Sequence, residues 1–168
     1  YLKIMIDENL FPLLKAQVDG KELIIGPKKI KENSRNGNSY NLQPTKFKVI
    51  TNSREIKELN VVSSGDFIIA SPINIGKLEI NMAGSGNILL EKKVEGNKLE
   101  INLASSGSVV ASNIDLAGIE CSLAGSGYIQ IAGKADRAEY NLAASGNIKA
   151  YECVTGKTEC NIAGSGNI

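Results

Sequence analysis

Six glutamates occupy one position of a repeated segment, and pairs of carboxylates are the groups that cleave glycosidic bonds. They are Glu58, Glu79, Glu100, Glu120, Glu139 and Glu159. A glycosidase needs two carboxyl groups about 5 to 9.5 Å apart, in surroundings that separate their pKa values. If successive repeats stack as neighbouring β-strands, adjacent glutamates lie about 5 Å apart. A carbohydrate-active enzyme, either a polysaccharide lyase or a hydrolase, is therefore one hypothesis for this chain.

The uniformity of this glutamate column argues against catalysis. Basic residues precede four of the glutamates by two positions, and they are Lys77, Lys98, Arg137 and Lys157. Residues two apart on a strand share a face, so acidic and basic rows would face each other and keep an exposed wall soluble. Nothing in the sequence raises the pKa of one glutamate above that of the next. We therefore expect a structural column and a protein that is not an enzyme.

The composition excludes several other kinds of chemistry. The 168 residues contain no histidine and carry a net charge of +1. Without histidine there is no Ser-His-Asp triad, no imidazole metal ligand and no ordinary proton shuttle. The charge offers no field to attract nucleic acid, and no apolar run approaches the roughly 18 residues of a membrane span. We predict no cofactor, no metal, no nucleic-acid partner and no transmembrane segment in this chain.

The three cysteines do not suggest a disulfide framework. Cys121 and Cys160 take the same repeat position two coils apart, or about 10 Å, whereas a disulfide needs Cα atoms within about 7 Å. Cys153 takes a different, apolar position of the repeat. We expect three buried thiols that pack as small apolar side chains.

A Ser-Gly step follows each glutamate and defines the repeat. It recurs after 21, 21, 20, 19 and 20 residues, and its glycines are Gly65, Gly86, Gly107, Gly127, Gly146 and Gly166. A period of this size is typical of a solenoid, in which one coil alone cannot bury its apolar face. Glycine suits a corner that needs positive φ or a close approach of two backbones. We predict that these six glycines form structural corners.

Apolar and polar residues alternate on either side of each corner. The segment Glu100–Leu103 shows the period of two that is typical of a half-buried strand, and Ile88 and Leu90 begin a second short strand. A third side carries Ile73, Val94, Ile114 and Cys153, with Gly133 at the same position in the fifth turn. Three short strands per repeat, with no helical period between them, predict an all-β parallel β-helix of about six coils of ~20 residues.

A column of asparagines and one corner tyrosine are candidates for surface contacts. The amides that follow the glutamates can hydrogen-bond along the solenoid axis or meet the hydroxyl groups of a glycan. The candidate contacts are Asn81, Asn102, Asn141 and Asn161, together with the corner residue Tyr128. Tyr140 falls at an inward position, so we expect it in the core.

Residues 1–57 lie outside the repeat, which covers 58–168. Leu13–Val18 and Glu22–Ile25 flank Asp19-Gly20 and predict a hairpin, and the polar stretch 28–44 predicts a loop. We expect this irregular β-rich third to cap one end of the stack, because solenoids protect their terminal strands. The last repeat stops at Ile168, so we expect an incomplete final coil and a longer natural protein.

These residues resemble one known family, the bacterial auto-transporter adhesins with a head GIN domain. The resemblance rests on the segments Gly86–Ile88, Gly146–Ile148 and Gly166–Ile168, and on the opening Asp7–Leu10 and Val18–Gly26. It implies a right-handed parallel β-helix that is secreted or attached to the envelope of Bacteroidetes-like bacteria, and it brings no catalytic residues. Asp66, Ser108 and Tyr128 interrupt the family's Asn position after the corner glycine.

We therefore expect a bacterial protein that lies outside the cytoplasm: periplasmic, attached to the outer membrane or secreted. We expect it to be adhesin-like or structural and to present polar walls to a cell-surface glycan or protein. One alternative is the carbohydrate-active enzyme. A further alternative is a lipid or small apolar ligand in a cavity around Phe47 and Phe67. A lipid anchor in the full-length protein and association through the coil ends are compatible with this sequence.

Overall fold

The computed structural model describes residues 2–19, 22–27, 47–62 and 64–168. Strands dominate these residues, and the described part of the chain holds no α-helix. The elements are β1 Leu2–Ile6, a 3₁₀ turn η1 Phe11–Leu13, β2 Leu14–Asp19, β3 Glu22–Pro27, β4 Phe47–Thr51, β5 Glu58–Val61, β6 Asp66–Ile69, β7 Ile73–Met82, β8 Asn87–Leu90, β9 Val94–Leu103, β10 Ser108–Leu123, β11 Tyr128–Leu142 and β12 Asn147–Ile162. None of the described helical segments has the length and apolarity to cross a membrane.

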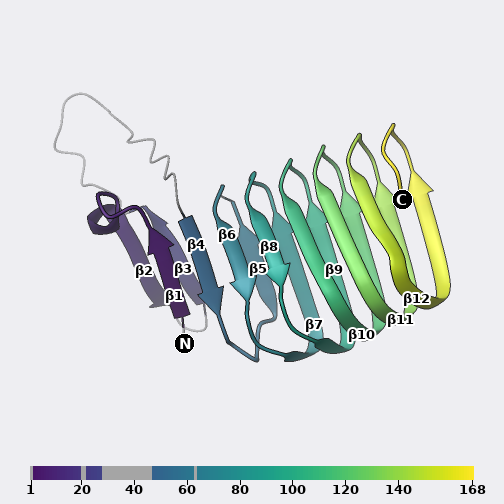
Figure 1. Cartoon of the computed structure of the whole chain (residues 1–168), viewed down its shortest axis with the longest axis horizontal. Coiled ribbons are helices and arrows are strands. Elements are labelled where there is room, and N and C mark those ends of the chain that lie inside the picture. Colours follow the sequence, from purple (N-terminus) through teal and green to yellow (C-terminus); the bar gives the residue numbers. More distant parts are fainter. Residues whose placement is uncertain (1, 20–21, 28–46, 63) are drawn as a thin grey trace. The chain divides into compact units, whose positions relative to one another are not determined.

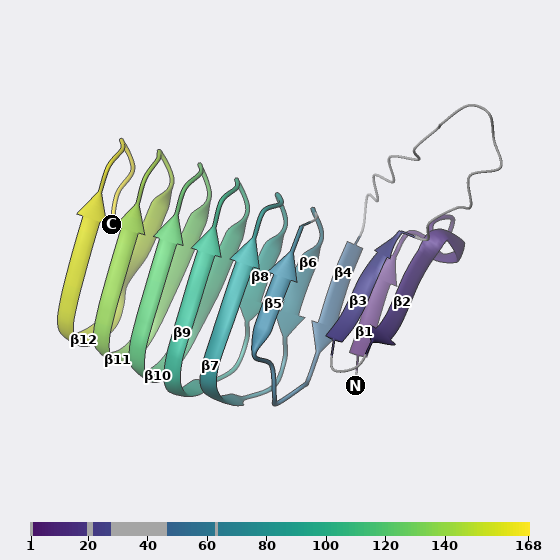
Figure 2. The same ribbon diagram turned by 180° about the vertical axis from the view of Figure 1, so that it is seen from behind.

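Parallel strands from β4 onward stack into a solenoid of about six turns, which confirms the predicted fold class. The wall nearest the viewer in Figure 1, here the front wall, consists of β4, β6, β8 and the segments 108–111, 128–131 and 147–150. The back wall, nearest the viewer in Figure 2, consists of β5 and the segments 77–82, 98–103, 118–123, 137–142 and 157–162. A short third side, beginning at Ile73 in the first complete coil, joins the two walls.

The predicted register is confirmed on the back wall. The six glutamates form five successive pairs between neighbouring coils, from Glu58 with Glu79 to Glu139 with Glu159. The third side follows the same rule, because Ile114 pairs with Gly133 and Gly133 pairs with Cys153. The 19- to 21-residue spacing is therefore the length of one turn, so equivalent side chains form continuous columns.

The inward positions of all three sides form one aliphatic core. Leu78, Ile88, Leu99 and Ile101 are fully buried, and Leu103 is 1% exposed. Tyr140 is also buried in this core, as its place in the alternation predicts. Dense packing of this kind leaves the inside of the tube filled with side chains rather than open to a ligand.

Two reasons were predicted for glycine at the corners, close backbone approach and positive φ, and the structure shows the first but not the second. A Cβ atom at Gly86 would overlap the backbone carbonyl of Gly65 in the preceding coil, so close backbone approach requires glycine there. Positive φ is absent from the described corners and occurs instead at Gly96, with φ 131°, and Gly133, with φ 126°. Both of these glycines lie on the third side, where the chain bends toward the back wall.

The expectation of three buried thiols is correct only for Cys121. Cys153 is half-buried and Cys160 is exposed. Cys160 continues the column of Cys121 and Tyr140, but it belongs to β12, and none of the described strands packs beside it on the outer side. All three cysteines are free.

The N-terminal residues form a separate compact unit. Met5–Phe47 clusters apart from a unit composed of Tyr1–Ile4 and Lys48–Ile168. The predicted hairpin is confirmed, because β2 and β3 pair antiparallel from Leu14 with Pro27 to Asp19 with Glu22. The polar loop predicted at 28–44 lies outside the described residues. The parallel stack already includes β4, which pairs with β6, and the capping role of the N-terminal third stays a prediction.

Candidate binding surface

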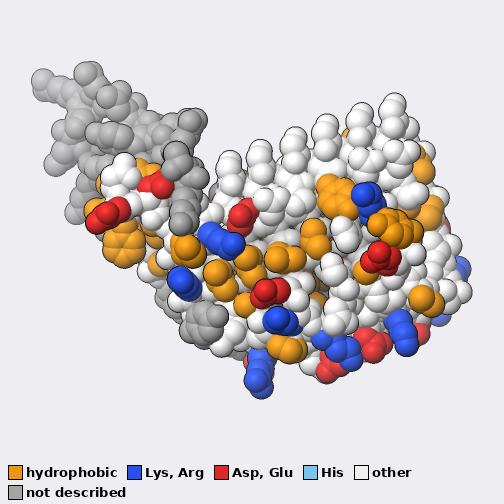
Figure 3. Space-filling view, viewed as in Figure 1, with side chains coloured by type: hydrophobic (Ala, Val, Ile, Leu, Met, Phe, Trp, Pro, Cys, Tyr) orange, Lys and Arg blue, Asp and Glu red, His pale blue; other side chains and the backbone are white. Residues whose placement is uncertain are grey.

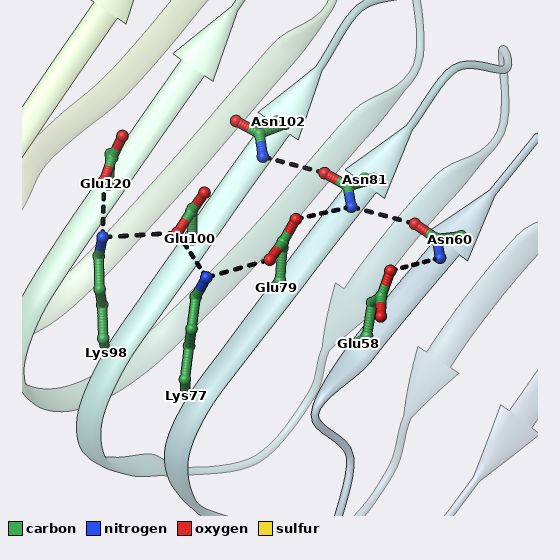
Figure 4. Close-up of polar contacts among 9 residues, drawn as sticks. All are labelled: Glu58, Asn60, Lys77, Glu79, Asn81, Lys98, Glu100, Asn102 and Glu120. Carbon is green, nitrogen blue, oxygen red and sulfur yellow. Dashed lines mark hydrogen bonds and ion pairs between the residues drawn. The ribbon is translucent and has the colours of Figure 1, made fainter. Parts of the chain in front are cut away.

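The outward side chains of the back wall are joined into a charged ladder (Figure 4). Lys77 Nζ lies 3.0 Å from Glu79 Oε2 and 3.1 Å from Glu100 Oε2 of the next coil. Lys98 Nζ repeats the pattern at 3.4 Å from Glu100 and 2.7 Å from Glu120. Each lysine thus neutralises carboxylates on two coils, which offsets the repulsion among Glu79, Glu100 and Glu120.

This charge pairing does not extend along the whole wall. Gly118 stands where the next lysine of the row would fall, so Glu120 relies on Lys98 of the preceding coil. Arg137 and Lys157 continue the row, but neither forms an ion pair within the part of the chain that the structure describes.

The Asn column of the back wall forms a hydrogen-bonded ladder that adjoins the charges (Figure 4). Asn81 Nδ2 donates to Asn60 Oδ1 at 3.0 Å and to Glu79 Oε1 at 3.0 Å, so both of its amide hydrogens are used. Asn102 Nδ2 donates to Asn81 Oδ1 at 2.9 Å. After a gap at Ser122 the ladder resumes, with Asn161 donating to Asn141 at 2.9 Å. Among the Asn residues predicted as glycan contacts, Asn81, Asn102 and Asn161 therefore donate to an asparagine of the preceding coil, and Asn141 donates to Glu139.

The ladder also sets the ionisation of the carboxylates. Hydrogen bonds from Asn81 and then Lys77 lower the pKa of Glu79, and a hydrogen bond from Lys77 lowers the pKa of Glu100. A general acid in glycoside hydrolysis needs a raised pKa. The described geometry therefore shifts these two carboxyl groups in the direction opposite to the one that such catalysis needs.

The outward side chains of the front wall are different, because its central row is aliphatic (Figure 3). Ile50 pairs with Ile68, Ile68 with Leu89, and Leu89 with Val110. All four side chains are half-buried and point outward, because the residues before and after each of them face the core. These four residues, here the aliphatic row, form a flat apolar strip across four neighbouring coils.

A polar row runs beside the aliphatic row on its corner side. Asn87 Nδ2 donates to Asp66 Oδ1 at 2.8 Å, and Ser108 Oγ donates to Asn87 Oδ1 at 2.6 Å. Tyr128 takes the next position of this row, in register with Ser108 and Asn147. Beside Leu89 and Val110 this edge is uncharged, whereas Asp66 and Lys48 continue it beside Ile68 and Ile50.

Tyr128 marks the end of the aliphatic row toward β12. Its hydroxyl donates to Gln130 Oε1 at 2.8 Å, and Lys149 Nζ lies 5.3 Å from the centroid of its ring. Gln130 and Lys149 continue the register of Val110, so the row changes there from aliphatic to polar and cationic. Tyr128 therefore lies on a different wall from the Asn ladder.

The aliphatic row was missed by sequence reasoning that followed only the inward positions. Its signal is three consecutive apolar residues in a strand that otherwise alternates: 67–69, 88–90 and 109–111. The first and third residues face the core, so the middle residue must face outward.

The lipid alternative places a cavity around Phe47 and Phe67, but among the described residues the core beside Phe67 is filled with side chains. Phe67 is half-buried and packs against the core. A hollow of about 470 Å³ lies instead at the outer edge of β12, where Tyr140, Cys153 and Cys160 are among the lining residues.

Comparison with known proteins agrees with the fold and with the motifs. The family model described as putative auto-transporter adhesin, head GIN domain, matches residues 1–112 and 84–168. No curated protein matches the chain.

Three crystal structures of related proteins superpose closely on this chain. A protein from Parabacteroides distasonis described as a putative lipid binding protein is 52% identical, with a TM-score of 0.85 over 96% of this chain and 65% of its own. A putative adhesin from the same species is 28% identical, with a TM-score of 0.82 over 98% and 66%. A putative adhesin from Parabacteroides merdae is 32% identical, with a TM-score of 0.74 over 95% and 63%. The chain thus spans less than two thirds of the length of these relatives, and it belongs to the family of putative auto-transporter adhesins with a head GIN domain.

Proposed function

We propose that this chain is part of a non-enzymatic, adhesin-like binding protein outside the bacterial cytoplasm, and that the front wall is its contact surface. The observation that carries this proposal is the contrast between the two walls. The back wall pairs its polar side chains with one another, whereas the front wall leaves a registered aliphatic row open to solvent. An exposed apolar strip with a polar rim is typical of an interaction surface.

The charge state of the glutamate column supports a role without catalysis. Asn81 and Lys77 lower the pKa of Glu79, and Lys77 and Lys98 lower the pKa of Glu100, so both carboxyl groups are shifted in the same direction. Two-carboxylate catalysis depends on unequal environments. Turnover of a polysaccharide that is lost in Glu100→Gln would favour the enzymatic alternative instead.

Lipid binding is the second candidate, favoured by the aliphatic row and by the description of the relative that is 52% identical. On this chain a lipid would lie along the front wall rather than inside the filled tube. Retention of a fluorescent fatty acid by the purified protein, and its loss in Leu89→Thr/Val110→Thr, would support this candidate over adhesion.

Adherence of protein-coated beads to host epithelial cells or mucus tests the main proposal. The double variant Leu89→Thr/Val110→Thr places β-branched side chains that suit a strand at both positions while removing apolar surface. We expect it to lose most of the adherence. The matched control is Glu120→Gln/Asn102→Thr on the back wall, which we expect to adhere like the wild type. Equal loss in both variants, or none in either, contradicts a front-wall contact.

A further inference from the structure

The end of the aliphatic row toward β12 carries a cation without an acidic partner. Gln130 and Lys149 take the two positions that follow Val110 in register. Lys149 is exposed, and among the described residues it forms no ion pair, whereas the lysines at 77, 93 and 98 each contact two carboxylates. Its positive charge is therefore available to a ligand on this wall.

The groups around this cation are held in place by the protein. The hydroxyl of Tyr128 donates to Gln130 Oε1, which orients both side chains. Lys149 Nζ lies over the Tyr128 ring, 5.3 Å from its centroid. Within the described residues Gln130 Nε2 donates no hydrogen bond, and Tyr151, two positions beyond Lys149, is 78% exposed. Ring, cation and amide donor thus lie together at the end of an apolar strip.

We propose that Tyr128, Gln130, Lys149 and Val110 form a subsite for a carboxylate-bearing sugar of a linear glycan. The inference rests on the front wall being the contact surface. A sugar ring has an apolar C–H face that packs on Val110 and the tyrosine, while its carboxylate pairs with Lys149 Nζ and a hydroxyl oxygen accepts from Gln130 Nε2. The remaining rings of the glycan then lie along the aliphatic row, beside the polar row of Asn87 and Ser108.

The same features favour a glycan over a membrane or an acidic peptide. Anionic membranes attract clusters of several basic residues, whereas this end of the wall presents one exposed lysine. The aliphatic side chains are half-buried and flush with the wall, so they do not reach into a bilayer. An extended peptide binds by adding to a free strand edge. The front-wall strands at Val110 and Gln130 are paired on both sides, so such a peptide would reach only the outer edge of β12 beside Lys149 and would not lie along the aliphatic row.

Binding of oligogalacturonate and of its carboxyl-reduced, neutral counterpart to the intact purified chain tests this subsite. We expect tighter binding of the acidic oligomer, and a loss of about five-fold in Lys149→Gln, the effect of one exposed ion pair. Binding of the neutral oligomer stays unchanged in that variant. The matched control is Lys134→Gln, which removes an exposed lysine from the third side and leaves both affinities within about two-fold of the wild type.

Several results would overturn the subsite without touching the proposed function. The first is equal affinity for the acidic and the neutral oligomer. The second is an equal effect of Lys149→Gln and Lys134→Gln on binding. The third is binding of poly-glutamate or phosphatidylserine vesicles that depends on Lys149 and is as tight as, or tighter than, binding of oligogalacturonate. If the Leu89→Thr/Val110→Thr variant still loses adherence in such a case, the front wall remains the contact surface and only its acidic-sugar subsite is rejected. If that variant adheres normally, the proposed function fails as well.

Discussion

The two walls of the solenoid share one core and one register but use their outer faces differently. On the back wall, Asn81 and Lys77 each connect neighbouring coils, so the polar side chains mainly contact one another. On the front wall, Leu89 and Val110 contact each other only as neighbours in a strip that remains open. A repeat can thus assign axial cross-linking to one wall and leave the other free for recognition.

Core truncation gives the largest expected effect and separates inward from outward positions of the front and back walls. Leu103→Ala removes a buried side chain that is 1% exposed, so we expect a loss of about 2–5 kcal/mol in the free energy of unfolding. Val110→Ala, on the outer side of the front wall, should cost less than about 1 kcal/mol because it leaves no internal cavity. Urea denaturation measures both, and similar losses would contradict the assigned in/out alternation.

Asn81→Asp tests the difference between the two walls by disrupting the Asn ladder of the back wall alone. The new carboxylate would face Asn60 Oδ1 and Glu79 Oε1, two acceptors that now receive hydrogen bonds from the amide. We expect a loss of about 1–3 kcal/mol at neutral pH, the range for an unsatisfied or repelled polar group. The control is Asn97→Asp, an exposed asparagine near a corner, which should change stability little. A loss of equal size in the control would mean that the ladder does not stabilise the wall.

The same ladder predicts how stability depends on pH. Because the pKa values of Glu79 and Glu100 are lowered in the folded protein, their contribution is complete above the unfolded value of about 4.3 and is lost as pH falls through the folded values. Because the pKa of Lys98 is raised, mainly by its hydrogen bond with Glu120, its contribution is lost at the alkaline end.

Urea midpoints recorded across this acid range for wild type and Glu79→Gln/Glu100→Gln test the pH prediction. The variant should show a flatter dependence between about pH 5 and pH 3. Glu91→Gln removes an exposed carboxylate next to the front wall and serves as the control, with an acid limb like that of the wild type. Parallel curves for all three proteins would rule out the ladder as the source of the pH dependence.

Tyr140→Phe has the smallest expected effect. The Tyr140 hydroxyl is buried with no hydrogen-bond partner among the described residues, and burial raises its pKa. Removing an unsatisfied buried hydroxyl leaves stability unchanged or raises it by up to about 1 kcal/mol. A thermal melt measures this effect. A clearly lower melting temperature in the variant would contradict the prediction and indicate that the hydroxyl makes a stabilising contact.

The sequence predicted the coil architecture because period and alternation act locally. The glutamate register and the place of Gly133 in the third-side column follow from counting residues. Features that depend on contacts between coils were harder to predict from the sequence. The positive φ of Gly96 arises where the chain bends around the neighbouring coil. Cys160 is exposed because β12 is the last described strand of the stack. The aliphatic row escaped notice because Leu89 and Val110 resemble core residues until the strand direction assigns them outward.

Blocking each wall in turn is the most direct measurement of the central claim. In a Cys153→Ser/Cys160→Ser background, a maleimide-linked polyethylene glycol on Leu89→Cys covers the front wall, and the same group on Lys77→Cys covers the back wall. The account predicts that the front-wall adduct abolishes adherence of protein-coated beads while the back-wall adduct retains it. Adherence that survives the front-wall adduct, or that is lost only with the back-wall adduct, would contradict the account.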